Sequence, residues 1–562
     1  MRMTRLAFGL LAGLVPLAAQ SPEPDLKQQL KDLKAQVTAL EEKAKEQEKA
    51  LTKVETRTAQ NAIAWGGDLR TRFDSQQWHF KPYQQFQGFV QTPAGAPWPY
   101  PFYPVTASVP AQDWDNSVQW STRLRLRMTI NINEHAKIMG RLTMYKVHGG
   151  ADVPIFNGNP STVANSFNSG KVPTNDVLHV ERASFVYDWP ELGVLSIGRQ
   201  NTSDGPPMEV REATERQATP QALAVNAMVD GIGWKFHLDK MGLPEHTLLG
   251  LCYGIGYESG FGGGGAVKAN AVVAGFNFSN ATMANPGNVT QVVRPVGPLK
   301  DSTVLGAMFD MPLLFEAFGA VHAANFYLGY NRFGNMTDIP FGSLQNFPVP
   351  PMPGMGGMPG VQMVTATNNL GDMDQWTATW KHKVGDTFTY FASFGYIKSH
   401  PNGKESQYGA YWNMPAGMGG PDTQLTGFGG LLGDPKASHT ATAYYAGLRW
   451  DPTEAWGFGL EFNHGSPRWF TYSPATGEAT EKLSTRGDVI EAYAAWQFTK
   501  NVILKLGYQD FSYTHAFSGW HIAPTPMQGT FEDAYDLSKN PMLQYASPAS
   551  IKNTYLSLEV RF

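Results

Sequence analysis

Arginines at every second position are the most distinctive chemical feature of this sequence. They form two sets, Arg70 with Arg72, and Arg123 with Arg125 and Arg127. Alternate side chains of an extended strand point to the same side, so each set predicts a row of guanidinium groups. Such a row attracts anions when it lines a water-filled space. It can equally brace a wall by pairing with carboxylates such as Asp68, Asp74 and Glu181, and both interpretations stay open at this stage.

A second concentration of charge lies in residues 201–224, where Pro206-Pro207 stiffens the beginning of the stretch. Acidic and basic side chains are interspersed here: Asp204, Glu209, Arg211, Glu212, Glu215 and Arg216. If the stretch folds into an enclosed passage, these charges form a filter at its constriction. The alternative is an ordinary solvated surface loop.

Catalytic and cofactor-binding signatures are missing from the sequence. It contains neither G-x-x-x-x-G-K-[ST] nor H-E-x-x-H, and its 13 histidines form no tight cluster with carboxylates. Cys252 is the only cysteine, which excludes an intramolecular disulfide and a C-x-x-C-H haem site. His464 and Ser466 are close in sequence, but no acid is evident that would orient the histidine. We therefore expect no enzymatic activity, no metal and no cofactor.

Residues 1–20 predict a signal peptide. Arg2 and Arg5 supply its positive region, Leu6–Leu14 its apolar region, and Ala18-Ala19-Gln20 small residues for cleavage. We therefore expect a secreted protein. The formal net charge of −4 leaves no basic surface of the kind that binds nucleic acid, so nucleic acid is not an expected partner.

Residues 22–60 contain no aromatic residue and no glycine, and apolar residues recur in steps of four and three. The seam comprises Leu26, Leu30, Leu33, Val37, Leu40, Leu51 and Val54, with weaker layers at Ala44 and Gln47. This heptad spacing predicts an α-helical coiled coil. A sustained apolar seam favours a homo-oligomer over a single solvated helix, although the number of helices does not follow from the pattern.

From residue 64 onward the periodicity changes to two. Between Val118 and Ile132 mostly apolar side chains alternate with polar ones over a length well above the usual strand of about 5–6 residues. One lipid-facing side and one water-facing side explain this pattern. The final residues repeat it, with Leu556, Leu558 and the terminal Phe562 on one face. A last strand ending in an aromatic residue resembles the assembly signal of outer-membrane barrels.

Short turns that join alternating segments allow the number of strands to be counted. They lie near Asn133–His135, Pro190–Gly193, Asp239–Glu245, Met311–Gly319, Lys383–Asp386, Trp450–Glu454 and Phe498–Asn501. Seven hairpins, with a first strand near Trp65–Phe73 and a last strand, predict an all-β antiparallel transmembrane barrel of about sixteen strands over residues 64–562. Both ends of the barrel and the helix of residues 22–60 are then expected in the periplasm.

Several stretches resemble a bacterial family of mostly uncharacterised porin-like outer-membrane proteins. They are Trp65–Phe73 (WGGDLRTRF), Ile197–Gln217, Val229–Ile232 (VDGI), Glu461–Phe470 (EFNHGSPRWF) and Arg486–Tyr493. The resemblance implies a signal peptide, a short coiled coil and a barrel, and it implies no particular substrate.

Passive transport of small hydrophilic solutes through the outer membrane is the function these features favour, with an anion bias from Arg123, Arg125 and Arg127. In porins of about sixteen strands the third outer loop often narrows the barrel, and residues 201–224 occupy that place in the sequence. Two alternatives remain. The barrel is an anchor for a structural or interacting coiled coil, or it is the sheath of a porin–cytochrome electron conduit, which would need a haem-bearing partner.

Overall fold

The structure of the protein is a computed structural model. It describes residues 63–91, 102–149, 178–200, 202–257, 270–277, 288–295, 300–337, 345–348, 361–364, 368–404, 430–472, 478, 482–515, 518–519, 521 and 548–562, with single positions between 31 and 47. The chain divides into two compact units, Met1–Ile63 and Ala64–Phe562.

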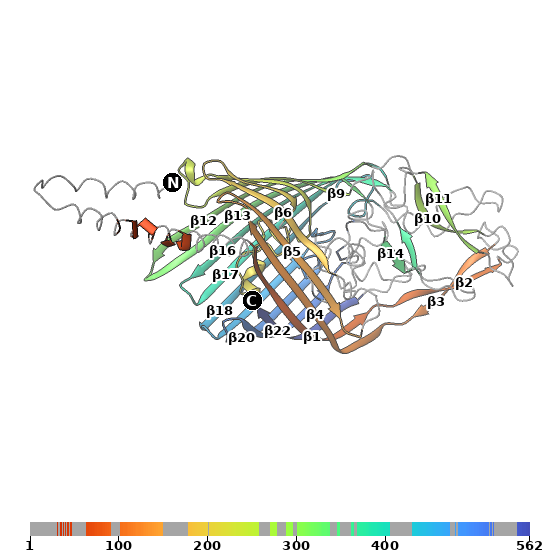
Figure 1. Cartoon of the computed structure of the whole chain (residues 1–562). Helices are drawn as coiled ribbons and strands as arrows, with labels where there is room; N and C mark the ends of the chain where they lie inside the picture. Colours follow the sequence, from red (N-terminus) through yellow and green to blue (C-terminus); the bar gives the residue numbers. More distant parts are fainter. Residues whose placement is uncertain are drawn as a thin grey trace, which may run out of the picture. The chain divides into compact units, whose positions relative to one another are not determined.

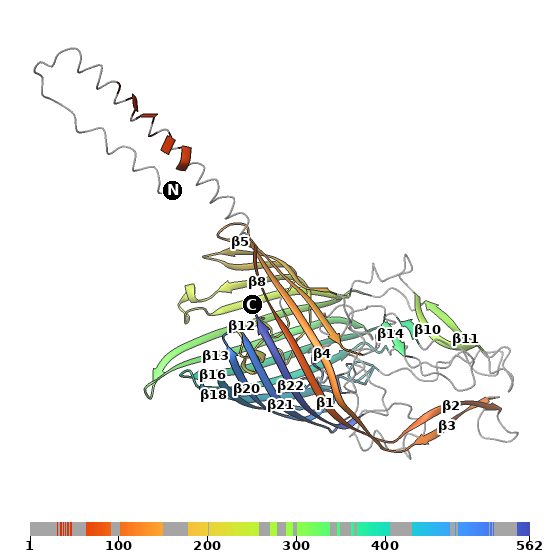
Figure 2. The same ribbon diagram turned by 60° about the horizontal axis from the view of Figure 1, so that its bottom comes forward.

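The second unit is a closed antiparallel barrel of sixteen strands, which confirms the predicted fold class (Figure 1). Its strands are β1 (Ile63–Phe80), β4 (Gln112–Asn131), β5 (Ala136–Val147), β6 (His179–Trp189), β7 (Gly193–Arg199), β8 (Asp230–His237), β9 (Leu248–Tyr257), β12 (Ser302–Ala317), β13 (Ala320–Thr337), β16 (Asn369–Val384), β17 (Phe388–Pro401), β18 (Thr440–Thr453), β19 (Trp456–Gly465), β20 (Gly487–Thr499), β21 (Val502–Tyr513) and β22 (Pro548–Arg561). Each pairs with its neighbours in the chain, and β1 lies between β22 and β4 to close the ring (Figure 2).

All seven predicted turns join consecutive strands at one end of the barrel. The predicted turn Met311–Gly319 is shorter than expected, because β12 continues to Ala317 and only Phe318 and Gly319 connect it to β13. Both residues have positive φ angles, 51° and 75°. The opposite end carries the long connections. Three of them contain two-stranded ribbons: β2 (Tyr83–Gln91) with β3 (Phe102–Val109), β10 (Asn270–Asn277) with β11 (Asn288–Pro295), and β14 (Gln345–Pro348) with β15 (Val361–Val364).

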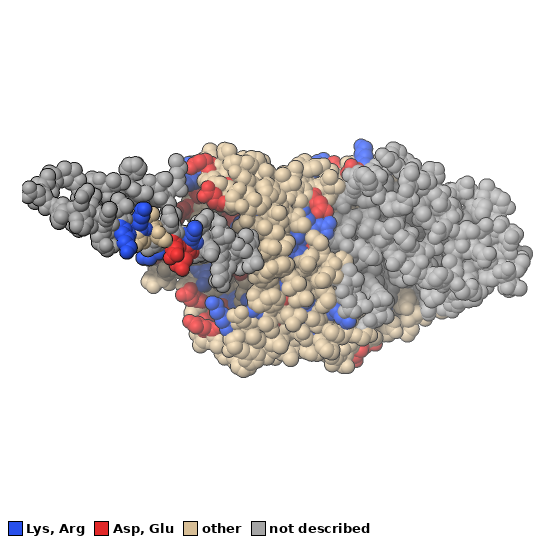
Figure 3. Space-filling model, in the orientation of Figure 1, with Lys and Arg blue, Asp and Glu red and all other residues tan. Residues whose placement is uncertain are grey.

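Alternation along the strands separates an apolar outer face from a polar inner face. On β4 the side chain of Val118 is 65% exposed whereas that of Gln119 is 8% exposed. On β22 Leu556 and Leu558 face outward while Tyr555 and Glu559 are buried inside. Figure 3 shows the result on one side of the molecule, where a broad band of uncharged residues covers the wall and most charged groups lie toward its two borders. This is the surface that a bilayer covers.

The hydrophobic core lies within the barrel. Long connections contribute Leu223, Leu431, Trp469 and Leu483, each fully buried, and inward side chains such as Tyr445 pack against them. Part of the interior is therefore solid protein.

In the first unit, every described position between 31 and 47 is helical and exposed. Val37 and Leu40 of the predicted seam are 48% and 66% exposed. Leu26, Leu30, Leu33, Leu51 and Val54, like the signal peptide, lie outside the described residues. No helix in the described part of the chain is long and apolar enough to cross a membrane.

Candidate functional site

Residues 202–229, between β7 and β8, fold into the barrel and reach its far wall. The segment contains a short helix, α4 (Met208–Glu212), most of whose side chains are buried. Arg211 of α4 donates to Glu491 on β20, with Nη1 and Oε2 3.1 Å apart. The sixteen-strand ring places β20 eight strands from β8 in either direction. The segment therefore crosses the full width of the interior.

Cations of the far wall bind the carbonyl groups at the end of α4. Lys505 Nζ lies 2.9 Å from the carbonyl oxygen of Arg211. Arg561 donates to the carbonyls of Ala213 and Glu212 at 2.8 and 2.6 Å. The last carbonyls of a helix lack intrahelical donors, so these contacts satisfy them and hold the segment against β21 and β22.

A buried ion network surrounds α4, formed by Arg72, Asp74, Arg211, Glu461, Glu478, Lys482 and Glu491. Burial alone would raise the pKa of the Glu478 carboxyl, but Arg211 and Arg72 outweigh it and hold that pKa below its usual range. Burial alone would lower the pKa of Lys482, but the carboxylates of Glu461 and Glu491 raise it. The groups thus stabilise one another in the charged form.

The predicted arginine rows face inward, and four of the five arginines contact carboxylates. Arg72 lies 2.8 Å from Asp74, and Arg70 4.0 Å from Glu478. Arg123 and Arg125 both contact Asp68 at 2.9 Å. Arg127 makes no ion pair with any residue that the structure describes, and it is only half-buried. The row therefore contains both paired arginines and one whose charge is not compensated by direct contact.

The charged residues of 201–224 form ion pairs with partners on several different strands. Asp204 contacts Arg125 at 3.1 Å, Glu209 contacts Lys381 at 2.7 Å, and Arg216 pairs with Asp310. Glu215 is exposed and forms no ion pair within the described ranges.

Sequence reasoning missed two inward arginines. Arg127, Arg141 and Arg182 stand opposite one another on β4, β5 and β6. A register shift after Arg141 places Glu181 and Arg182 both inside, where Glu181 binds Arg141. The inward orientation of Arg141 follows the alternation of its strand and could have been predicted. The inward orientation of Arg182 could not, because a bulge breaks the period of two.

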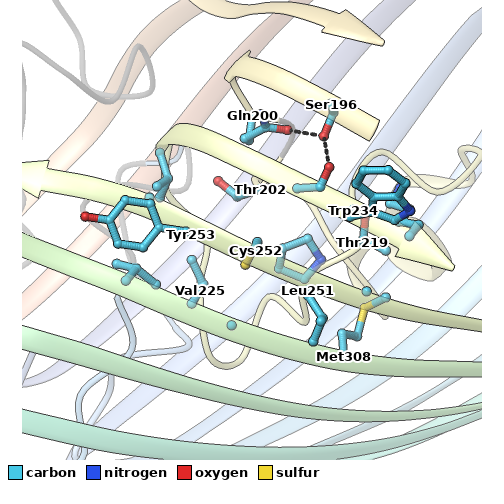
Figure 4. A pocket seen from close by; sticks show the side chains of 18 of the residues that line it. Ser196, Gln200, Thr202, Thr219, Val225, Trp234, Leu251, Cys252, Tyr253 and Met308 are labelled. Carbon is cyan, nitrogen blue, oxygen red and sulfur yellow. Dashed lines mark hydrogen bonds between the residues drawn. The ribbon is translucent and has the colours of Figure 1, made fainter. Parts of the chain in front are cut away.

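Beside the inserted segment, a cavity of about 310 Å³ remains open against β5–β9, β12 and β13 (Figure 4). Part of this wall carries small inward side chains or none. One row across β7, β8, β9 and β12 consists of Ser196, Gly233, Cys252 and Gly306. A second row contains Gly198, Gly231 and Gly254. We call these seven positions the glycine wall.

Neighbouring side chains approach some of these glycines so closely that no larger residue would fit. A Cβ at Gly254 would lie 2.1 Å from Val229 Cγ1, and one at Gly306 2.5 Å from Cys252 Sγ. At the adjacent Gly250 the nearest atom would be Met308 Cε at 3.6 Å, an ordinary contact. The wall is thus recessed by its lack of side chains, and Gly250 is a position where one can be added.

The arrangement of His464 and Ser466 differs from the prediction in one respect. His464 does have a carboxylate partner, since its Nδ1 lies 2.8 Å from Asp488 Oδ1 on the neighbouring strand. The Ser466 hydroxyl accepts from the amide of Thr442 and donates to the carbonyl of Pro467. In the described part of the chain no group of three or more His, Cys, Asp or Glu side chains is arranged to hold a metal ion.

A closed sixteen-strand barrel with an apolar outer wall, a charged interior and an inserted segment is a porin-like barrel of the outer membrane. The chain belongs to the family described as "Protein of unknown function (DUF3373)", whose profile matches residues 113–562.

Several solved outer-membrane structures resemble the chain at low identity. OmpT of Vibrio cholerae is 9% identical with a TM-score of 0.37, over 89% of this chain and 97% of that one. The outer-membrane channel DcaP of Acinetobacter baumannii is 11% identical with a TM-score of 0.36, over 89% and 97%. Salmonella typhi OmpF in complex with daunomycin is 10% identical with a TM-score of 0.35, over 88% and 97%. No curated protein matches the chain.

Proposed function

We propose that this protein is an outer-membrane channel for passive passage of small hydrophilic solutes, with a bias toward anions. The observation that carries the proposal is the unequal filling of the barrel. Residues 202–229 pack against β16, β18, β20, β21 and β22 through Lys381, Arg449, Glu491, Lys505 and Arg561. Space is left on the opposite side, beside the glycine wall.

The proposed path runs along the glycine wall and is narrower than an empty sixteen-strand lumen. Fixed charges beside such a path act through a lower effective dielectric constant than charges at a wide mouth. The anion bias rests on Lys137, Arg182 and Lys235, which line the cavity, and on Arg127 in the same half of the barrel. Paired arginines such as Arg125 contribute less, because Asp68 and Asp204 offset them.

The alternative of a barrel that merely anchors the N-terminal helix has one observation in its favour. Much of the interior is packed with apolar side chains, among them Trp469 and Leu431. The cytochrome-sheath hypothesis requires a vacant lumen, and the segment 202–229 crosses it. We therefore retain the anchor as the second candidate function.

Conductance of the full-length protein in a planar bilayer distinguishes a channel from a membrane anchor. A channel gives discrete conductance steps, and Gly250→Leu reduces them because it adds a side chain to the lining of the cavity, where a Cβ meets only ordinary contacts. Ile255→Trp is the matched control, since Ile255 lies on the same strand and faces outward at 39% exposure. Wild-type protein that inserts without conducting would favour the anchor.

A further inference from the structure

The cavity beside the glycine wall has a chemical character that a simple water-filled passage does not need. Apolar side chains face it from both sides: Met139, Val186, Val194 and Met308 from the barrel, and Val225 and Val229 from the inserted segment. A volume of about 310 Å³ lies at the lower end of the range of about 300–1,000 Å³ for small-molecule sites. The cavity thus has the size and lining of a binding site.

Its charged side chains have one sign. Lys137, Arg182 and Lys235 line the cavity, and no Asp or Glu does among the described residues. Two neighbouring acids are engaged elsewhere, since Asp310 pairs with Arg216 and Glu181 with Arg141. Asp188 on β6 lies in the same row as Val194 and Lys235 but does not line the cavity, so the three cations of the lining outnumber it. The cavity therefore carries an excess of positive charge in an apolar setting, where a charge without a partner is costly.

Two of these cations lack the partners that buried cations normally have. Arg182 is 8% exposed, and its Nε has no hydrogen-bond partner within the described structure. Its Nη2 contacts only the carbonyl oxygen of Ser203, at 3.4 Å. Lys235 is partly buried and makes no ion pair or hydrogen bond with a described residue. An ammonium that faces the cavity without a protein partner is free to bind an acceptor that enters the cavity, and a buried guanidinium nitrogen without an acceptor adds to the positive character of the lining.

We propose that this cavity binds an organic anion, a single carboxylate joined to a compact apolar body, as a station on the proposed path. The carboxylate lies at the ammonium of Lys235, and the apolar body lies against Val194 and Met308, which occupy the same row of the sheet as Lys235, and against the glycine wall. An inorganic anion would leave the apolar surface facing water, and an organic cation would meet the three positive side chains. The proposal rests on the channel function, and it specifies the substrate class.

The only cysteine of the chain makes a direct test possible. Cys252 belongs to the glycine wall, is exposed, and lies in the cavity (Figure 4). The rate at which a small uncharged thiol reagent labels it therefore reports occupancy. The full-length protein is reconstituted in lipid and labelled with three probes at equal ionic strength: benzoate, acetate, which lacks the apolar body, and benzylammonium, which carries the opposite charge.

We expect benzoate to slow labelling of Cys252 in a saturable manner, and acetate and benzylammonium to leave the rate unchanged. Lys235→Met should weaken protection by about tenfold or more, the value of one charged hydrogen bond. Lys500→Met, at an exposed turn between β20 and β21, is the control and should match the wild type. Heat-modifiable electrophoretic mobility verifies that each variant is a folded barrel.

Equal protection by all three probes, or none by benzoate, would overturn the proposal. So would unchanged benzoate protection in a folded Lys235→Met variant. Conductance measured without benzoate separates this result from the channel function. A conducting protein that benzoate does not protect refutes the site alone, whereas protection without conductance refutes the channel and leaves the binding site in place.

Discussion

The guanidinium of Arg211 donates to the carboxylate of Glu491 across the barrel, with a sequence separation of 280 and 3.1 Å between Nη1 and Oε2. Neither side chain is more than 4% exposed. Because Arg211 also contacts Glu478, it compensates two buried carboxylates.

Replacing Arg211 with Met should therefore release the inserted segment. Removing one partner of a buried ion pair costs roughly 3–5 kcal/mol, because the remaining charges stay buried. We expect larger and noisier single-channel conductance and a lower unfolding temperature. Adding Glu491→Gln should restore part of both. Arg332→Met is the control: Arg332 pairs with Asp372 at 41% exposure and should have little effect. Unchanged conductance in Arg211→Met would mean that this contact does not hold the segment.

Arg127 should influence ion selectivity more than its neighbours on β4. Arg123 and Arg125 share Asp68, whereas Arg127 has no compensating contact within the described structure. Reversal potentials under a salt gradient should shift toward cations in Arg127→Gln, and less in Arg123→Gln. If the triple change to Gln at 123, 125 and 127 leaves the permeability ratio unmoved, the arginines are braces of the wall.

Deleting Phe562 should impair assembly in the outer membrane. Its amide donates to the carbonyl of Gly67 at 3.1 Å, and its carbonyl accepts from the amide of Gly67 at 2.8 Å, so it joins β22 to β1. Phe562→Ala keeps these bonds and removes only the ring, which is 58% exposed. If the ring is the assembly signal, both variants show a reduced amount of folded barrel in membranes. Normal assembly of Phe562→Ala would assign the effect to the backbone closure.

Acidification should loosen the packing around His521. Burial lowers the pKa of its imidazole from 6.5 to about 4, against the opposing effect of its bond to the Thr337 carbonyl. The folded state favours the neutral ring, so this stability is present above pH 6.5 and is lost as the pH falls toward 4. The shift corresponds to about 3 kcal/mol at most.

The amide of Leu432 reports this change, since it donates to the carbonyl of His521 at 2.7 Å. Its hydrogen-exchange protection factor should fall between pH 7 and pH 4.5. In His521→Gln, which does not titrate, the factor should stay level over that interval. A fall of the same size in both proteins would exclude the imidazole as its cause.

Self-association is expected to depend on the N-terminal helix. Val37 and Leu40 are exposed apolar positions on a helix, which a partner helix would cover. Leu33→Lys with Leu40→Lys should reduce the mass of the detergent-solubilised protein in light scattering. Ala35→Lys with Thr38→Lys adds the same charge outside the seam and should leave the mass unchanged. Equal masses for both variants would place the oligomer contact elsewhere.

The barrel itself was predictable because its signal is local. Side-chain direction in a strand repeats every two residues, so the neighbours Val118 and Gln119 must point to opposite faces. Turns such as Asn133–His135 show where the chain reverses direction. The inward orientation of Arg123, Arg125 and Arg127 follows from the same rule.

Contacts between distant residues were decided only by the tertiary structure. No feature of the sequence near Arg211 predicts its contact with Glu491. His464 contacts Asp488 because β19 pairs with β20. The bulge that turns Arg182 inward breaks the local period on which prediction depends. Glycines have no side chains whose polarity could show a pattern, so the glycine wall could not be predicted from the sequence. The cavity beside it, with the unpaired Lys235, is defined by the position of the inserted segment inside the barrel.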